Sequence, residues 1–428
     1  MKKLALPKID AVRGTVKLPG SKSISNRSLL LSALGKGPIH LKNLLSSNDV
    51  DRMFEGMQTL GLDISRNTDE LTADLVGCGG PLPSGDFNLY LENAGTAVRS
   101  MTAAVCASQG TYIIDGNERM RERPIKDLVD ALNKLNIDIE YQMDPTCPPL
   151  KIKANGIKGG ETSVNGSVSS QYITALLMSA PLAEGPVTIK IDGDLTSKPY
   201  VDMTINLMNK FGVKVTNNNY ESFEVPAPQQ YINPTEFYVE GDAGSASYFL
   251  GAAAVSGSIR VYGCGQDSIQ GESGFAGVMG KMGAEVTYGE DFIEVSSTGK
   301  LKGIDIDMNT MTDTGMTLAV VAMFAEGPTI IRNIANWQVK ETKRITAVAA
   351  ECRRAGAIVE EGEDYLVINP PEKIQGCEIE TYDDHRMAMA FAILSLGCDD
   401  ITILDPDCCK KTFPNYFAVR ESVAITAE

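Results

Sequence analysis

The stretch Gly20–Leu34, GSKSISNRSLLLSAL, places two cations at the start of a helix-like segment. Lys22 and Arg27 stand in a head with three serines, which are favoured N-cap residues, and a mostly apolar run follows from Leu29. The N-terminus of a helix offers unpaired N–H groups and the positive end of a dipole, so it suits an anion. Taken alone, the stretch fits a capped core helix with two solvated cations equally well.

Three other short segments carry cations that could serve the same chemistry. Arg123 precedes a predicted helix start in MRERP, and Lys410–Lys411 precede TFPNYF. In NWQVKETKR, Lys340 and Arg344 lie one helical turn apart on one face, with Glu341 beside them. Each of these charges alone is more simply a solvated surface charge, so their position relative to a larger pattern decides their meaning.

That pattern is an internal repeat. A helix-like apolar run ending in a small residue or glycine, followed by a strand-like alternation, occurs six times. The spacings between successive marker glycines are 73, 75, 72, 70 and 70 residues. The markers are Gly37, Gly110, Gly185, Gly257, Gly327 and Gly397. A period this regular predicts six copies of one structural unit.

A second marker recurs with the same period as the first and indicates which elements lie within each repeat. The segments LGL, LNI, FGV, MGA and AGA, which begin at residues 60, 135, 211, 282 and 355, each close an amphipathic helix and open a strand. Each unit then reads strand, helix, strand, helix and one or two strands. Parallel strands joined by helices predict an α/β fold of six βαβαββ repeats, with the first helix of each repeat the more buried.

The sixth repeat stops short and indicates how the domains are divided. Only about twenty residues follow LDPD at 404–407, enough for the helix FPNYFAVRESVAI but not for closing strands. The N-terminal stretch Leu4–Leu18, with its alternation GTVKL, would fill the gap. We therefore predict a continuous three-repeat domain, 21–239, and a discontinuous one, 1–20 with 240–428. Crossings near 19–21 and 239–241 would act as a hinge beside an inter-domain cleft.

The heads of the six buried helices, aligned on the marker glycines, are rich in capping residues. Three of them also carry an arginine about eleven residues before the glycine: Arg27, Arg99 and Arg386. Capping explains the Ser, Asp, Asn and Gly residues, but it does not explain an arginine just inside a buried helix, where an unpaired charge is costly. If the heads converge, they form a cationic pocket suited to phosphates and carboxylates.

Composition limits the classes of function. The 428 residues contain 43% hydrophobic and 22% charged residues, which describes a folded chain of more than one domain. The net charge of −16 argues against a nucleic-acid or anionic-membrane surface, and no apolar run reaches membrane-spanning length or forms a signal peptide. Nine cysteines without a CxxC pair favour a reduced, cytoplasmic setting. Because His40 and His385 are the only two histidines in the sequence, a histidine-based metal site is improbable.

Ten segments, in order along nearly the whole chain, resemble signatures of the 5-enolpyruvylshikimate-3-phosphate synthase family. They are GSKSISNR, NAGTAVR, RERPI, SSQY, SKPY, EGDAGSASYF, the loop around Asp313, NWQVKETKR, TYDDHRMAM and KTFPNYF. The resemblance implies a fold of two domains, each of three βαβαββ units, that close on their substrates. It also implies transfer of the enolpyruvyl group of phosphoenolpyruvate to the 5-hydroxyl of shikimate 3-phosphate, in the sixth step of the shikimate pathway.

Matching motif by motif, the resemblance implies two sets of binding residues. The shikimate 3-phosphate set is Lys22, Ser23, Arg27, Ser169, Ser170, Gln171, Ser197, Tyr200, Asp313, Asn336 and Lys340. The phosphoenolpyruvate set is Lys22, Asn93, Gly95, Thr96, Arg123, Gln171, Glu341, Arg344, His385, Arg386 and Lys411. The residues implied for catalysis are Asp313, Glu341, Lys22 and His385.

The chemistry accounts for these residue types. Addition of the 5-hydroxyl to C2 of phosphoenolpyruvate requires removal of the hydroxyl proton and protonation of C3, after which the tetrahedral intermediate expels phosphate. Asp313 is the candidate base, and Glu341 and Lys22 both remain candidates for the acid. The cations offset two phosphates and two carboxylates and hold the reacting carbons together. Such a reaction needs no cofactor and no metal, and we expect a monomer.

Three places depart from the family pattern and leave inhibitor sensitivity open. Glu92 and Ser100 flank NAGTAVR where the glyphosate-sensitive branch of the family has Gly and Pro, and TDTGM at residues 312–316 differs from the usual Ala-rich version. Because Gly95 is kept, we expect glyphosate, which mimics phosphoenolpyruvate, to bind still.

Three rival functions have weaker support. The sister family that uses UDP-N-acetylglucosamine as acceptor has a cysteine acid in a Gly/Pro-rich loop, whereas NERMRERP contains none. A P-loop nucleotide binder would need the G-x-x-x-x-G-K-[ST] spacing, which Gly20 and Lys22 do not provide. A non-catalytic anion-binding module would not need both Asp313 and Glu341.

Overall fold

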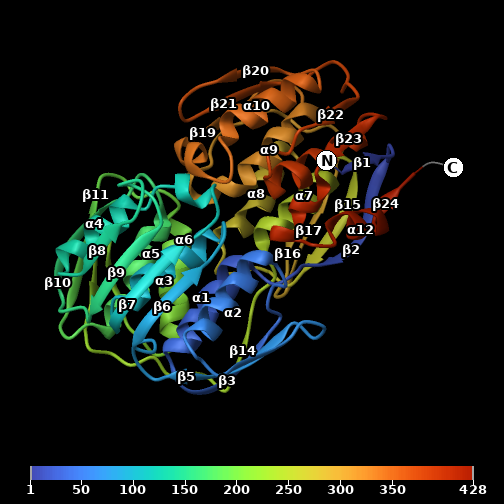
Figure 1. Ribbon diagram of the computed structural model, residues 1–428. Helices are drawn as coiled ribbons and strands as arrows, with labels where there is room; N and C mark the ends of the chain where they lie inside the picture. Colours follow the sequence, from blue (N-terminus) through green and yellow to red (C-terminus); the bar gives the residue numbers. More distant parts are fainter. Residues whose placement is uncertain (1, 427–428) are drawn as a thin grey trace. The chain divides into compact units, whose positions relative to one another are not determined.

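The computed structural model describes residues 2–426 (Figure 1), which form two compact units. One is continuous and runs from Gly20 to Val239. The other joins the N-terminal residues through Pro19 to the residues from Glu240 onward. We call them the continuous unit and the split unit and describe each by itself.

The second repeat of the continuous unit shows the pattern most completely. Strands β6 (Gly85–Tyr90) and β7 (Gln109–Asp115) are parallel and are joined by α3 (Gly95–Val105). After α4 (Lys126–Lys134) the chain returns through β8 (Asp138–Tyr141) and β9 (Leu150–Asn155), giving a sheet in the order β6-β7-β9-β8 with the last pairs antiparallel. This is the βαβαββ unit that the marker residues predict.

Two further four-stranded sheets complete the continuous unit, in the orders β14-β3-β5-β4 and β10-β11-β13-β12. Their strands are β14 (Glu236–Tyr238), β3 (Lys36–Lys42), β5 (Thr72–Cys78), β4 (Ile64–Asn67), β10 (Gly160–Asn165), β11 (Val187–Asp192), β13 (Ser222–Val225) and β12 (Thr216–Asn218). Their helices are α1 (Lys22–Leu34), α2 (Asn48–Thr59), α5 (Ser170–Ser179) and α6 (Lys198–Lys210).

The split unit has three sheets, in the orders β16-β17-β15-β2-β24, β18-β19-β21-β20 and β1-β23-β22. The strands are β1 (Lys3–Leu6), β2 (Ala11–Lys17), β15 (Gly257–Tyr262), β16 (Glu285–Tyr288), β17 (Phe292–Ser296), β18 (Asp305–Asp307), β19 (Thr329–Arg332), β20 (Ile358–Glu361), β21 (Leu366–Asn369), β22 (Cys377–Ile379), β23 (Ile401–Leu404) and β24 (Ala424–Ile425). The α-helices are α7 (Ala243–Val255), α8 (Phe275–Met282), α9 (Gly315–Val321), α10 (Arg344–Arg354), α11 (His385–Phe391) and α12 (Tyr416–Ser422).

Two of the marker glycines, Gly110 and Gly257, have a steric cause. Gly110 has a φ of 124°, and a Cβ atom there would lie 2.1 Å from the carbonyl oxygen of Gly85 on the parallel partner strand. Gly257 has a φ of 115°, and its Cβ would lie 1.9 Å from the carbonyl oxygen of Val12. Glycine is therefore required where the second strand of these repeats begins beside the first.

The N-terminal residues serve two repeats, which corrects one part of the sequence interpretation. β1 pairs antiparallel with β23 and so supplies the closing strand that the sixth repeat lacks, as expected. The segment GTVK instead lies in β2, which pairs parallel with β15 and opens the fourth repeat. The predicted helix at residues 413–425 is also shorter: α12 ends at Ser422, and β24 then pairs with β2.

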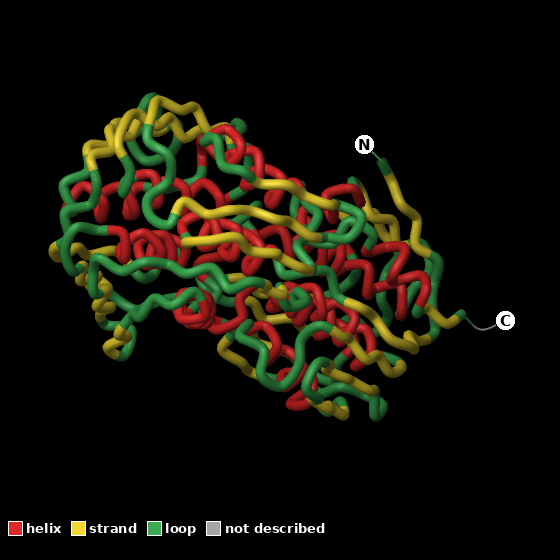
Figure 2. Tube along the Cα trace, turned by 90° about the horizontal axis from the view of Figure 1, so that it is seen from below, coloured by secondary structure: helices red, strands yellow, loops and turns green. Residues whose placement is uncertain are grey.

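The first helix of each repeat forms the core of its unit. In α1 every residue from Ile24 to Leu34 is buried, and α3 is buried along its whole length. In the split unit α7 is buried from Ala243 to Ala254, and α9 and α11 are entirely buried. Helices that are apolar on all sides belong in an interior, and Figure 2 shows strands around the helices of each unit. The α/β repeat architecture is confirmed.

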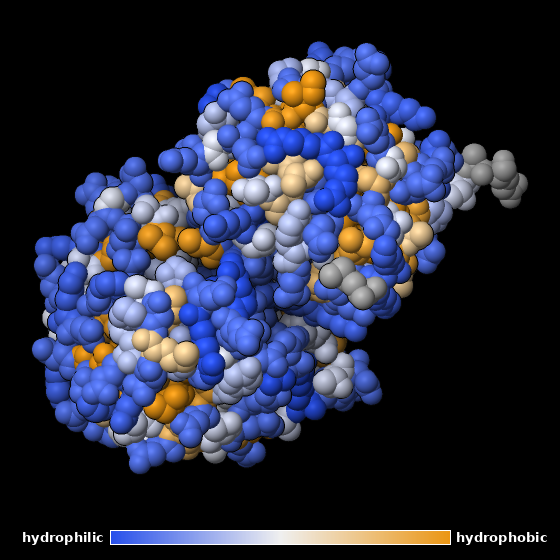
Figure 3. Space-filling view, turned by 45° about the horizontal axis from the view of Figure 1, so that its top comes forward, coloured by the Kyte–Doolittle hydropathy of each residue, from blue (hydrophilic) through white to orange (hydrophobic). Residues whose placement is uncertain are grey.

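The face drawn in Figure 3 is mostly hydrophilic. Figure 3 shows apolar residues only in small separate groups on the face drawn. Across residues 2–426, none of the helices combines the length and the apolar character required to cross a membrane.

Candidate active site

The site residues implied by the sequence fall into two sets, one in each unit. The continuous unit holds Lys22, Ser23, Arg27, Asn93, Gly95, Thr96, Arg123, Ser169, Ser170, Gln171, Ser197 and Tyr200. The split unit holds Asp313, Asn336, Lys340, Glu341, Arg344, His385, Arg386 and Lys411.

The head of α1 is fixed by a cap and an ion pair. Ser21 is the N-cap and its hydroxyl oxygen accepts from the N–H of Ile24 at 3.5 Å. Lys22 lies 3.3 Å from a carboxylate oxygen of Asp49, which is buried in the first turn of α2. The sequence interpretation missed Asp49, because an acidic residue in the first turn of an amphipathic helix is ordinary helix chemistry.

Arg27 is buried where α1, α5 and α6 meet. Its Nε donates to the hydroxyl of Thr204 at 2.8 Å, and its two Nη groups donate to the carbonyl of Ser23 and the hydroxyl of Thr174. The two threonine hydroxyls are 3.1 Å apart, and Thr204 also donates to the carbonyl of Tyr200 at 2.8 Å. The guanidinium carbon lies 6.0 Å from the centre of the Tyr200 ring. These contacts fix the direction of the guanidinium.

The head of α3 brings two guanidinium groups to a glycine. Arg123 donates to the side-chain and main-chain oxygens of Asn93 at 2.9 and 3.3 Å, and Arg99 donates to the carbonyls of Gly95 and Pro124. A Cβ atom at Gly95 would lie 2.9 Å from a nitrogen of each arginine. The absence of a side chain therefore lets both cations lie against the start of the helix. Among the described residues, the buried Nε of Arg123 has no hydrogen-bond partner.

The third repeat contributes serines. Ser169 is the N-cap of α5, and its hydroxyl accepts from the N–H of Gln171 at 3.2 Å. Ser197 precedes α6 and has a φ of 55°, a left-handed conformation that non-glycine residues seldom adopt. Tyr200, one turn later, begins the face of α6 that meets Arg27. A strained residue of this kind is typical of a ligand site.

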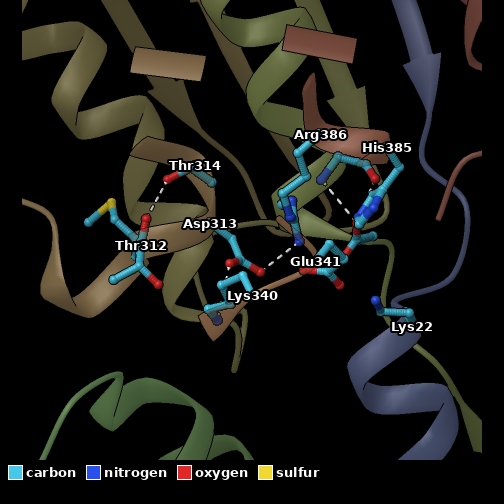
Figure 4. Close-up of polar contacts among 12 residues, drawn as sticks. Lys22, Thr312, Asp313, Thr314, Lys340, Glu341, His385 and Arg386 are labelled. Atoms are coloured by element: carbon cyan, nitrogen blue, oxygen red, sulfur yellow. Dashed lines mark hydrogen bonds and ion pairs between the residues drawn. The ribbon is translucent and has the colours of Figure 1, made fainter. Parts of the chain in front are cut away.

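Asp313 is the centre of the site in the split unit. It lies in a 3₁₀ segment, Asn309–Thr314, just before α9. Its carboxylate is 2.9 Å from Arg344, 2.8 Å from Arg386 and 3.4 Å from Lys340, and Figure 4 shows it pointing toward Arg386 and Lys340. The indole N–H of Trp337 donates to the carbonyl of Thr312 at 2.9 Å, which fixes the loop.

Asp384 joins two of these elements and was not assigned from the sequence. Its side chain caps α11 by accepting from the N–H of Arg386 at 3.0 Å. The same carboxylate accepts from Arg344 at 2.8 and 3.4 Å. Both Asp384 and Arg344 are almost completely buried. The DDHR head contains a capping signal, but the pairing with Arg344 joins residues that are 40 positions apart in the sequence, which no local pattern predicts.

Glu341 and Lys411 lie at the same site. Glu341 accepts from Arg344 at 2.8 Å and is 3.4 Å from the ammonium group of Lys411. Lys411 closes the 3₁₀ segment Pro406–Lys411, and His385 opens α11 with its Nδ1 3.5 Å from Asp384. The described part of the split unit therefore brings four cations together with three carboxylates. The cations are Lys340, Arg344, Arg386 and Lys411, and the carboxylates are Asp313, Glu341 and Asp384.

The charges set the protonation of Asp313. Burial raises the pKa of its carboxyl group, but Arg386, Lys340 and Arg344 outweigh burial and hold the pKa well below its usual range. Burial lowers the pKa of Arg344, and Asp384, Glu341 and Asp313 more than reverse this and raise it. In this state Asp313 is a carboxylate, and its cations are already engaged.

Comparisons with known proteins identify the family that the chain resembles. The model of the EPSP synthase family, described as 3-phosphoshikimate 1-carboxyvinyltransferase, matches residues 6–419. The 3-phosphoshikimate 1-carboxyvinyltransferase of Vibrio atlanticus is 51% identical over 419 residues, covering 97% of this chain and 98% of the relative. That of a Marinomonas species is 49% identical over 425 residues, covering 99% and 100%.

A solved structure supports the fold. The EPSP synthase of Acinetobacter baumannii superposes with a TM-score of 0.84 at 23% identity, covering 100% of this chain and 99% of that one.

Proposed function

The chain belongs to the EPSP synthase family of 3-phosphoshikimate 1-carboxyvinyltransferases, and from that membership we propose the residues that carry the reaction. The protein transfers the carboxyvinyl group of phosphoenolpyruvate to the 5-hydroxyl of shikimate 3-phosphate and releases phosphate. Relatives at about 50% identity over nearly the whole chain carry this activity in their names, which favours it over transfer to UDP-N-acetylglucosamine.

We assign shikimate 3-phosphate chiefly to the continuous unit. Arg27, held in direction by Thr204 and Thr174, offers charge to the phosphate, and Lys22 and the serines Ser169 and Ser170 lie at the heads of α1 and α5. Tyr200 provides an aromatic face for the ring. From the split unit, Asp313, Asn336 and Lys340 complete the set.

Phosphoenolpyruvate is assigned to residues of both units. In the continuous unit these are the Gly95 head, with Asn93, Thr96 and Arg123, together with Lys22 and Gln171. In the split unit they are Arg344, Arg386, Lys411, Glu341 and His385. The two arginines can each meet a carboxylate with two parallel hydrogen bonds, which positions the ligand as well as holding it.

The cluster around Asp313 is the observation that carries the mechanism. A carboxylate with such a low pKa is a weak base while it is paired with Arg386, Lys340 and Arg344. The carboxylate and phosphate groups of the substrates compete for those cations. Binding of both substrates therefore releases Asp313 and raises its pKa, so that it can take the proton of the 5-hydroxyl. Glu341 and Lys22 both remain candidates for protonating C3.

A phosphate-release assay tests the proposal. The wild-type chain is expected to release phosphate only when both substrates are present, and Asp313→Asn is expected to lose most of this activity. Asp305→Asn is the matched control, because Asp305 is also paired with an arginine, Arg332, but is exposed and lies away from the cluster. Release with phosphoenolpyruvate alone, or equal activity of the two variants, would contradict the assignment.

We also propose that ligand binding changes the relation of the two units, with hinges near residues 19–21 and 239–241. Cations that repel one another without ligand are attracted by a shared anion, and shikimate 3-phosphate is assigned contacts in both units. Small-angle scattering should show compaction on adding it, and an unchanged radius of gyration would refute the hinge. We further propose a cytoplasmic monomer that needs no cofactor and binds glyphosate at the phosphoenolpyruvate site.

A further inference from the structure

The segment before α11 has a backbone conformation that its residues do not favour. Tyr382 and Asp383 have φ angles of 54° and 55°, so two successive non-glycine residues are left-handed. Each such residue is unfavourable, and the conformation persists only where surrounding contacts impose it. We call residues 380–384 the strap, because they lead directly to His385 and Arg386.

Glu351 supplies contacts of this kind. It lies on α10 and its side chain is completely buried. One carboxylate oxygen accepts from the hydroxyl of Tyr382 at 2.9 Å, and the other accepts from the N–H of Glu380 at 3.2 Å. Arg354 lies 3.5 Å away on the solvent side. Both oxygens of a buried carboxylate thus hold the strap.

Arg344 holds the other end of the strap. It lies seven residues before Glu351 on α10, two helical turns away and on the same face. It donates to Asp384, which in turn accepts from the N–H of Arg386. Helix α10 therefore fixes the strap at Glu380 and again at Asp384, and the two strained residues lie between these points.

We propose that Glu351 is a positioning residue for phosphoenolpyruvate: by holding the strap in its left-handed conformation it sets the direction of Arg386 and of the Asp384–Arg344 pair. The inference rests on the proposed assignment of Arg386 and Arg344 to phosphoenolpyruvate. Without Glu351, Tyr382 and Asp383 relax toward negative φ, and the first turn of α11 moves with them.

Glu351→Gln is the primary test. A glutamine can still accept from the Glu380 N–H and donate to the Tyr382 hydroxyl oxygen, but it removes the negative charge, so both bonds lose the charge assistance that strengthens them. The KM for phosphoenolpyruvate should rise about fivefold to tenfold, while the KM for shikimate 3-phosphate stays within about twofold. Tyr382→Phe removes one bond at a partly exposed side chain, keeps the fold, and should shift the KM for phosphoenolpyruvate in the same direction.

A rescue pair separates positioning from general destabilisation. Asp383→Gly and Asp383→Ala remove the same carboxylate, but only glycine adopts the positive φ of residue 383 without a steric cost. In the Glu351→Gln background, glycine should restore much of the affinity for phosphoenolpyruvate, and alanine should not. Equal effects of the two substitutions, or equal rises in both KM values, would overturn the proposal.

Hydrogen exchange tests the strap without using either substrate. Exchange of the amides of residues 384–387 should accelerate in Glu351→Gln and slow again when Asp383→Gly is added. Unchanged exchange in Glu351→Gln would refute the role in positioning the strap. Absence of phosphate release by the wild-type chain would instead refute the proposed function, so the two failures are distinguishable.

Discussion

The head of α3 and the cluster around Asp313 hold arginines in different ways. At α3, the hydrogen bonds described for Arg123 are to the neutral oxygens of Asn93, and its buried Nε has none within residues 2–426. At the cluster, Arg344 donates to three carboxylates, those of Asp313, Glu341 and Asp384. One site orients a cation with neutral oxygens, and the other neutralises it.

The difference teaches what an incoming anion must do at each place. Neutral oxygens direct a guanidinium without cancelling its charge, so an anion at the α3 head gains a contact and displaces little. At the cluster an anion competes with Asp313 for Arg344, Arg386 and Lys340. The first arrangement favours binding, and the second couples binding to the basicity of a carboxylate.

Removing Asp313 should give the largest effect. Asp313→Ala is expected to fold, because Arg344 keeps Asp384 and Glu341, and to turn over about 10²–10⁴-fold more slowly. It should also bind phosphoenolpyruvate at least as tightly as the wild type, since a competitor for the cations is lost. Steady-state kinetics and calorimetry measure the two quantities, and near-normal kcat would exclude Asp313 as the base.

The same substitution predicts a pH dependence of stability. The pKa of Asp313 is lower in the folded chain than in the unfolded chain, so the carboxylate stabilises the fold above its unfolded pKa. That contribution is lost as the pH falls through the folded value. The difference in Tm between wild type and Asp313→Ala should therefore shrink in acid, and a difference that grows in acid would contradict the low pKa.

Arg27→Ala should weaken shikimate 3-phosphate roughly 10- to 100-fold, the value of one hydrogen bond to a charged group, and phosphoenolpyruvate less. The hydroxyl groups of Thr204 and Thr174 fix the direction of the Arg27 guanidinium, and because hydroxyls carry no charge they do not neutralise it. Calorimetry with each ligand measures the split. Equal losses for the two ligands would show that the assignment of Arg27 is wrong.

Gly95→Ala should raise the KM for phosphoenolpyruvate up to roughly tenfold and leave that for shikimate 3-phosphate unchanged. The added Cβ would be 2.9 Å from nitrogens of Arg123 and Arg99, and these flexible ends would move away from the helix start. Gly80→Ala is the control, because a Cβ there meets no atom of the described chain within 4 Å. A larger effect on shikimate 3-phosphate would reverse the comparison.

The smallest effect concerns Ser100 and glyphosate. The hydroxyl of Ser100 donates to the carbonyls of Thr96 and Ala97, so Ser100 is hydrogen-bonded to the helical turn that Gly95 begins. We expect weaker inhibition by glyphosate in this chain than in its Ser100→Pro variant, with the KM for phosphoenolpyruvate changing less than Ki. Ki, KM and Tm of both proteins decide it, and an unchanged Ki/KM ratio would disprove the prediction.

Much of the fold could be predicted from local signals. At Gly110 and Gly257 the marker reflects a close approach of parallel strands, which ties it to the start of the second strand of a repeat. Ser21, Ser169 and Asp384 do cap their helices. The sequence did not show that β1 belongs to the sixth repeat and β2 to the fourth. Both segments alternate in a similar way, so either could have been the strand that the sixth repeat lacks.

The site was less predictable where its contacts are long-range. The resemblance supplied residue types, but Asp384 and Glu351 act through the packing of α10 against the strap. Thr174 and Thr204 meet Arg27 across three helices and stand in no motif. The choice between Glu341 and Lys22 as the acid depends on substrate position, which residue types alone do not determine.

The split unit has a consequence for synthesis on the ribosome. β1 and β2 emerge before the other strands described, but their partners β15, β23 and β24 lie about 240 to 400 residues later in the chain. The continuous unit has all its strands between Gly20 and Val239 and can assemble while translation continues. For that whole interval β1 and β2 are strands with unpaired edges, which are prone to wrong pairing. Nascent chains stalled after residue 239 should therefore depend on chaperones at their N-terminal end, and a circular permutant that starts at Gly20 should escape this dependence.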